Sequence, residues 1–196
     1  MTQNPFAGPE GLARHALAQL GRAVADSRHG FHWPALAAGG TARVVVLRRY
    51  DPAARTWRFY TDARSPKVQV LAEAGGRCEG LFYDGKRRLQ LRLRGVASRN
   101  DDAGLLDDIW RGLPAKGKLS YAGSEAPGAT LPEGERAWSA TWLAGEPTPE
   151  EDAAARANFR VYEVAVEHFD ALSLAGGNNQ RAAWTDDAAG ARWLYP

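Results

Sequence analysis

The sequence predicts one α+β domain built on an antiparallel β-barrel with flanking helices. Short segments rich in β-branched and aromatic residues are separated by glycine, proline and aspartate turn signals. Helical patterns precede these segments and stand between them. No internal repeat, low-complexity tail or linker divides the 196 residues, of which 44% are hydrophobic. This length and composition suit a single domain over residues 1–196 with a substantial apolar core.

The N-terminal segment has the pattern of an amphipathic helix over about residues 10–27. Apolar side chains recur there at helical spacing, at Leu12, Ala16, Leu20 and Val24. Phe31, Trp33 and Pro34 are expected to begin a short loop. Residues 41–61 are then expected to form one hairpin, because two runs of β-forming residues flank the turn signal Asp51–Pro52.

A helix is expected next over residues 67–74. Ser65 and Pro66 supply its start signals, and Gly75–Gly76 ends it. Two strands follow at 77–83 and 87–97 around a tight turn at Asp84–Gly85. In the second strand leucines alternate with polar residues, so one face carries the leucines and the other face carries Arg88, Gln90, Arg92 and Arg94.

The last third of the chain is expected to return to the sheet. Residues 101–111 have a helical pattern, and residues 112–147, rich in Gly, Pro and Ser, are expected to form a long loop, which is often functional in a compact domain. Thr148 begins a further helix with Pro149 at its first position and Glu151 three residues after the cap. Three or four closing strands then lie within 158–196, which together with 40–100 would make up the barrel.

Composition excludes several classes of function. Twenty-five Lys and Arg oppose 23 Asp and Glu, for a net charge of +2. This balance does not indicate a nucleic-acid-binding protein. The arginines at 88–94 also have no aromatic residues between them on which bases would stack. No run of 18 apolar residues predicts a membrane span. The first residues lack a signal-peptide pattern, so we expect a cytoplasmic protein.

Common catalytic and metal-binding motifs are also missing. Cys78 is the only cysteine, and none of the four histidines forms an HExxH pair, so no metal site is expected. The sequence contains neither a GxSxG nor a GxGxxG motif. Residues 112–118 match the first seven positions of a phosphate-binding loop. Leu119, however, stands where a hydroxyl should hold magnesium, and a helical pattern precedes the motif.

Of the 25 cationic residues, 21 are Arg and four are Lys. Most of these arginines are explained by compositional preference. Three segments stand out because they carry polar groups on apolar strands or at a helix start. Ser65, Lys67 and the start of the following helix offer donors for a phosphate, to which Arg43 could add its guanidinium. Gln90 can donate and accept, which suits a sugar-like chain or a ring edge. On spacing alone, ordinary exposed strand charges remain the alternative.

These segments belong to an ordered series of short motifs. They are R-x-V-x-L-R at 43–48, F-Y-T-D at 59–62, S-x-K at 65–67, Q-L-R-L-R-G at 90–95, N-F-R-V at 158–161, Arg181 three residues before Trp184, and the closing R-W-L-Y-P. In this order and spacing the sequence resembles the pyridoxamine 5'-phosphate oxidase-like, FMN-binding split barrels, as a divergent subgroup. The resemblance covers residues 40–100 most closely and 158–196 less closely.

The resemblance implies a cofactor site. Arg43 and Lys67, with Ser65 nearby, would hold the FMN phosphate. Arg48 would lie near the flavin ring, and Tyr60 and Thr61 would line it. Gln90 and Arg181 would complete the site. In this family the barrel forms a homodimer, and FMN lies in the interface groove, where both subunits touch it.

The resemblance carries less information about the substrate. In the oxidase an Arg-x-His element before the equivalent of Arg181 grips pyridoxal phosphate, whereas residues 176–180 here read Gly-Gly-Asn-Asn-Gln. We therefore expect an FMN-binding oxidoreductase that acts on a different small molecule, with no catalytic side chain identified. The alternative is a flavin-binding carrier or sensor without turnover.

Overall fold

The structure is a computed structural model that describes residues 6–185 and 190–196. Residues 186–189, within the expected barrel segment 158–196, lie outside the described residues. The helices are α1 (Pro9–Ala25), α2 (Pro66–Glu73), α3 (Ala103–Gly112), α4 (Ala115–Lys118), α5 (Ala140–Ala144) and α6 (Pro149–Asn158). The strands are β1 (Ala35–Ala38), β2 (Thr41–Val44), β3 (Arg49–Asp51), β4 (Thr56–Asp62), β5 (Arg77–Asp84), β6 (Leu89–Asn100), β7 (Phe159–Ser173), β8 (Gln180–Thr185) and β9 (Arg192–Leu194).

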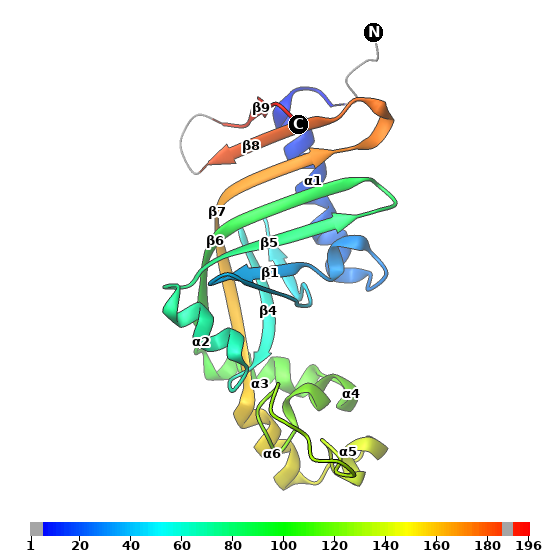
Figure 1. Cartoon of the computed structure of the whole chain (residues 1–196), viewed down its shortest axis with the longest axis vertical. Helices are drawn as coiled ribbons and strands as arrows, with labels where there is room; N and C mark the ends of the chain where they lie inside the picture. The colour runs from blue at the N-terminus through cyan, green and yellow to red at the C-terminus, as the bar shows by residue number, and fades with distance from the viewer. Residues whose placement is uncertain (1–5, 186–189) are drawn as a thin grey trace.

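The described strands form one antiparallel sheet in the order β2-β1-β5-β6-β7-β4-β3, with β8 on β7 and β9 on β8. The sheet divides along the 15-residue strand β7. The first half of β7 pairs with β4, and the second half of β7 pairs with β8. Figure 1 shows β7 bending between these two halves. The sheet does not close, and the expected fold class, an antiparallel split barrel with flanking helices, is confirmed.

One bulge shapes the long β6–β7 pair. The register shifts between Arg94 and Gly95, where an extra residue is taken up on β7. A β-carbon added at Gly95 would stand 1.8 Å from the carbonyl oxygen of Ala165. Only glycine therefore allows the two backbones to approach this closely.

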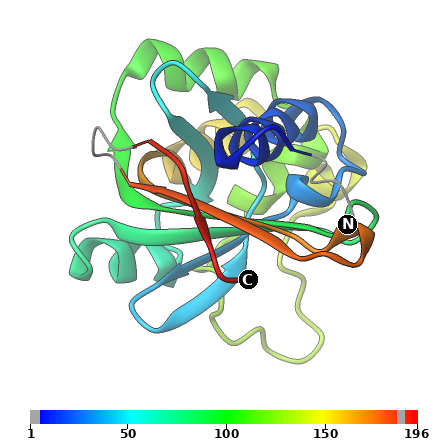
Figure 2. The ribbon, with the colours of Figure 1, turned by 90° about the horizontal axis from the view of Figure 1, so that it is seen from above.

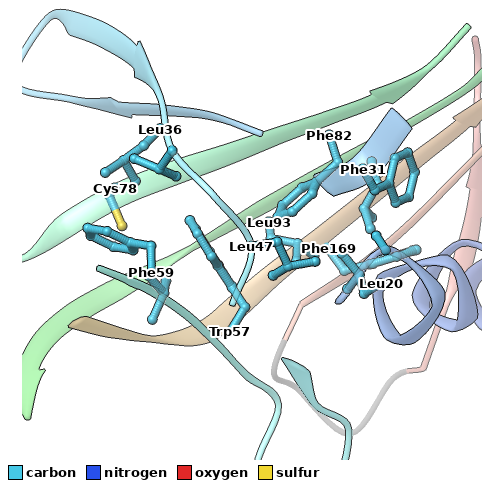
Figure 3. Packing of buried hydrophobic residues seen from close by; sticks show 14 of the residues in the cluster. Leu20, Phe31, Leu36, Leu47, Trp57, Phe59, Cys78, Phe82, Leu93 and Phe169 are labelled. Carbon is cyan, nitrogen blue, oxygen red and sulfur yellow. The ribbon is translucent and has the colours of Figure 1, made fainter. Parts of the chain in front are cut away.

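The main core lies between the curved sheet and α1. Leu12, Ala16 and Leu20 of α1 are fully buried, as the helical spacing predicts. Figure 2 shows α1 lying along one side of the sheet. Trp57 of β4 packs edge-on against Phe82 of β5, with ring centres 5.5 Å apart. These rings lie among the buried side chains drawn in Figure 3, which come from strands, α1, the loop before β1 and the loop after β2.

A second, smaller cluster lies at the far end of β7. Trp110, Tyr121, Trp142 and Phe159 are its large buried side chains. They come from α3, the segment 112–147, α5 and the start of β7. The capping box at Thr148 is present as expected, since the Thr148 side chain accepts from the Glu151 N–H and the Glu151 carboxylate accepts from the Thr148 N–H.

Two expectations were wrong in detail. Residues 41–61 do not form one hairpin. Gly39 and Gly40, with φ of 53° and 76°, instead turn β1 into β2, and Leu47 leaves the sheet to bond the carbonyl of His32. Strand β1 was not expected, and three of its four residues are alanines, which have a weak strand preference. Residues 112–147 are not one uninterrupted loop, since α4 and α5 form within them.

None of the described helices combines the length and the apolar character that a membrane span requires.

Candidate functional site

A cluster of cations and hydroxyls lies where β4 leads into α2. The Lys67 ammonium donates to the Thr61 hydroxyl at 2.9 Å and to the Ser65 hydroxyl at 2.7 Å. Ser65 is the residue before the helix, but its side chain bonds Lys67 instead of capping α2. Thr61 and Ser65 are buried, at 3% and 5% exposure. We call Arg43, Thr61, Ser65 and Lys67 the cation cradle.

The cradle has an excess of positive charge. Burial lowers the pKa of Lys67, the nearby Arg43 lowers it further, and Asp62 partly opposes this. Asp62 does not bond Lys67, because both of its carboxylate oxygens accept from Arg64, at 2.7, 3.1 and 2.8 Å. A partly buried ammonium that bonds only hydroxyls attracts an anion.

Arg43 brings a second cationic group to the cradle. The Nη2 nitrogen of its guanidinium donates to Thr41 on the same strand. The Nη1 nitrogen is buried and has no hydrogen-bond partner within the described part of the chain. A buried N–H without an acceptor is costly, and an anionic oxygen at the cradle would satisfy it. The residues present therefore fit a phosphate group.

Arg48 and Tyr60 form a second contact beside the cradle. The Arg48 guanidinium lies 5.1 Å from the centre of the Tyr60 ring. Its Nε is buried and has no partner among residues 6–185 and 190–196. Tyr60 packs edge-on against Phe159, and burial raises the pKa of its phenol. Tyr60 and Thr61 are successive residues of β4, so their side chains lie on opposite faces of the strand. Only Thr61 therefore belongs to the cradle.

The other two expected site residues, Gln90 and Arg181, lie elsewhere in the chain. Both are paired with Leu172 of β7, one from each side, so the three occupy one row across the sheet. Tyr60 is paired with Val161, eleven residues earlier on β7, and at about 3.3 Å per residue this is roughly 36 Å along the strand. Figure 1 shows the β5–β6 and β7–β8 turns together at one end of the sheet, away from α2.

The row of Gln90 and Arg181 borders a network of ion pairs that sequence reasoning missed. Arg181 donates to Asp170, and Arg92 donates to Glu79 through two bonds of 2.8 and 2.9 Å. Arg92 also lies 3.9 Å from Asp170. We call Glu79, Arg92, Asp170 and Arg181 the ion-pair ladder. The alternating polar residues Gln90, Arg92 and Arg94 of β6 were the available signal, but the partners of these residues depend on strand register.

The comparisons with known proteins concern the family and the fold. Residues 29–100 match the family model described as pyridoxamine 5'-phosphate oxidase, FMN-binding domain. No curated protein matches the chain significantly.

Solved structures share the fold across the whole chain. A pyridoxamine 5'-phosphate oxidase-related, FMN-binding protein of Nostoc punctiforme superposes with a TM-score of 0.71 over 100% of both chains, at 21% identity. PhzG of Burkholderia lata, solved with tetrahydrophenazine-1-carboxylic acid, has a TM-score of 0.68 and 19% identity over 98% of this chain and 95% of that one. A Clostridium acetobutylicum protein of the pyridoxinephosphate oxidase family has a TM-score of 0.55 and 10% identity over 91% and 96%.

Proposed function

Because residues 29–100 carry the FMN-binding domain of the pyridoxamine 5'-phosphate oxidase family, we propose that the whole chain is an FMN-dependent oxidoreductase with its own small-molecule substrate. Bound FMN supplies the redox chemistry, while the protein binds and orients it. The observation that carries the proposal is the cation cradle. Among the residues that the structure describes, its Lys67 bonds only hydroxyls, and its Arg43 keeps a buried nitrogen without an acceptor.

In this proposal the cradle holds the FMN phosphate. Lys67 and Arg43 offset its charge, and the Thr61 and Ser65 hydroxyls orient the ammonium toward it. The β4 backbone at Tyr60 and Thr61 then runs along the ring. Arg48, fixed against the Tyr60 ring, presents its buried Nε to the flavin or to an anionic part of the substrate.

We further propose that two copies of the chain complete each FMN site. Gln90 and Arg181 lie too far along the sheet to reach the cradle of their own chain. A second copy on the open face of the sheet can bring them to it. Leu81 and Tyr83, exposed at 39% and 51%, belong to this face and would be covered by such contact.

The substrate differs from pyridoxamine 5'-phosphate in this account. The turn between β7 and β8 is built by Gly176 and Gly177, whose φ values are 73° and 72°, and it contains neither Arg nor His. The turn therefore offers no cationic side chain to a second phosphate. A small molecule without a phosphate suits this side of the site better.

Three measurements on the purified protein test the proposal. The absorption spectrum should show flavin bands after addition of FMN, and light scattering after gel filtration should give twice the mass of the chain. NADPH and a panel of amines should then reduce the bound flavin. A colourless protein that takes up no FMN would contradict the cofactor and the function together. FMN binding without turnover of any donor would favour the carrier or sensor.

A further inference from the structure

The ion-pair ladder crosses the four strands β5, β6, β7 and β8 on the open face of the sheet. Arg181 of β8 contacts Asp170 of β7 through two nitrogens, with Nε at 3.1 Å and Nη2 at 2.6 Å from the carboxylate oxygens. Asp170 is paired with Ala183 in the register, so it reaches Arg181 diagonally along one face. The two side chains are 15% and 30% exposed. Arg181 is therefore fixed by a partly buried, two-point contact.

Asp170 is held from its other side as well. Nη1 of Arg92 on β6 lies 3.9 Å from the Asp170 carboxylate, and Glu79 of β5 accepts from the Nε and Nη2 of Arg92. The charges therefore alternate across the sheet, from Glu79 through Arg92 and Asp170 to Arg181. A carboxylate held between two guanidinium groups has little freedom to move, and it limits the rotamers of Arg181.

This contact decides what Arg181 can offer to a ligand. Its Nε–H and one Nη2 hydrogen are engaged, so the Nη1 edge carries most of the remaining donors. Its charge is offset by Asp170, in contrast to Lys67, whose hydrogen-bond partners in the described part of the chain are hydroxyls. An offset guanidinium suits a neutral acceptor, such as a ring carbonyl or a ribityl hydroxyl, better than a phosphate.

We propose that Asp170 is a positioning residue for the flavin. It fixes Arg181 so that the free edge of the guanidinium donates to the flavin ring or the ribityl chain in the partner subunit's cradle, and it removes the net charge from this contact. Glu79 holds Arg92 in the same way but does not contact Arg181. This inference rests on the proposed FMN site and on its completion by a second copy.

The test compares FMN and riboflavin, which share ring and ribityl chain but differ by the phosphate. Arg181→Gln and Asp170→Asn should each weaken the binding of both flavins by the same factor, about tenfold, because a charge-assisted contact is lost or misplaced. The double variant should be no weaker than Arg181→Gln alone, since Asp170 acts through Arg181. Asp170→Glu, which keeps the carboxylate, should recover part of the affinity.

Glu79→Gln is the matched control, because it removes a ladder carboxylate that does not bond Arg181, and it should leave both affinities near wild type. Gel filtration and the urea midpoint show whether each variant still folds and dimerises. Wild-type affinity in Asp170→Asn, a loss for FMN alone, or additive losses in the double variant would each overturn the inference. Failure of the wild-type protein to bind either flavin would instead contradict the proposed function.

Discussion

The cation cradle and the ion-pair ladder use the same kind of residue in opposite ways. In the cradle, Lys67 donates to the hydroxyls of Thr61 and Ser65, and the nearby Asp62 carboxylate is paired with Arg64. In the ladder, Arg92 and Arg181 each have a carboxylate within 2.9 Å. The cradle lies where β4 leads into α2, whereas the ladder runs across β5, β6, β7 and β8.

This difference shows that the role of a cationic side chain is indicated by the groups it contacts. The presence of a Lys or Arg alone does not indicate the role. A cation left with hydroxyls and an unsatisfied buried N–H keeps its attraction for an incoming anion. A guanidinium that a carboxylate already holds contributes direction more than charge. The cradle is therefore expected to govern phosphate affinity, and the Asp170–Arg181 pair of the ladder is expected to govern orientation.

The largest expected effect is on the cradle. Lys67→Ala should weaken FMN binding by about 1.5–3 kcal/mol, because one charge-assisted phosphate contact is lost. Titration calorimetry or quenching of flavin fluorescence measures this. Lys67→Arg should retain most of the affinity, and Lys86→Ala, at an exposed position in the β5–β6 turn, should change nothing. Equal affinity for wild type and Lys67→Ala would place the phosphate elsewhere.

A second variant would make the cradle resemble the ladder. Ser65→Asp places a carboxylate beside Lys67, so FMN affinity should fall by about tenfold as the ammonium gains an internal partner. Aspartate is also a favourable residue before a helix, so thermal stability should hold or rise. Ser65→Asn, which is similar in shape and uncharged, is the control. Affinity and stability falling together would indicate a misfolded variant and not a neutralised cradle.

The pH dependence of binding gives a smaller effect. Burial and Arg43 lower the pKa of Lys67 below its ordinary value of 10.5. The charged form binds phosphate, so FMN affinity should fall as pH rises through this lowered pKa, and binding in that range should take up a proton. Lys67→Arg should show no such fall, because arginine keeps its charge. An identical alkaline fall in both proteins would assign the titration to another group.

The smallest effect concerns stability. Glu79→Gln should lower the free energy of unfolding by about 0.2–1 kcal/mol, because the pair with the half-exposed Arg92 is lost. Lys67→Met should not lower it, because burial already disfavours the charged ammonium in the folded chain. Urea unfolding measures both changes in stability, from the shift of the midpoint between variants that share the same m-value. A larger loss of unfolding free energy for Lys67→Met than for Glu79→Gln would contradict this expected difference between the cradle and the ladder.

Local patterns predicted much of the fold. Helix α1 follows from the spacing of Leu12, Ala16 and Leu20, and α6 begins at the capping box of Thr148. Strand β1 escaped prediction because its residues are mostly alanine, and its place depends on the turn at Gly39 and Gly40. Propensity describes single segments, whereas this hairpin is fixed by pairing with β5.

The candidate site was predictable only in part. The short S-x-K motif predicted that Ser65 and Lys67 lie together, because the two residues are only two positions apart in the sequence. The partners of Arg181 were hidden, because Asp170 reaches it across two strands whose register only the folded sheet defines. The separation of Gln90 from the cradle likewise follows from the length of β7 and not from any local pattern.

The most direct test of the cradle is the ratio of riboflavin to FMN dissociation constants, measured for the wild type and for Lys67→Ala under the same conditions. The account predicts that wild-type protein binds FMN at least tenfold more tightly than riboflavin. It also predicts that Lys67→Ala reduces this preference, while its affinity for riboflavin is nearly unchanged. A wild-type protein that does not distinguish the two flavins, or a Lys67→Ala variant that loses both equally, would contradict it.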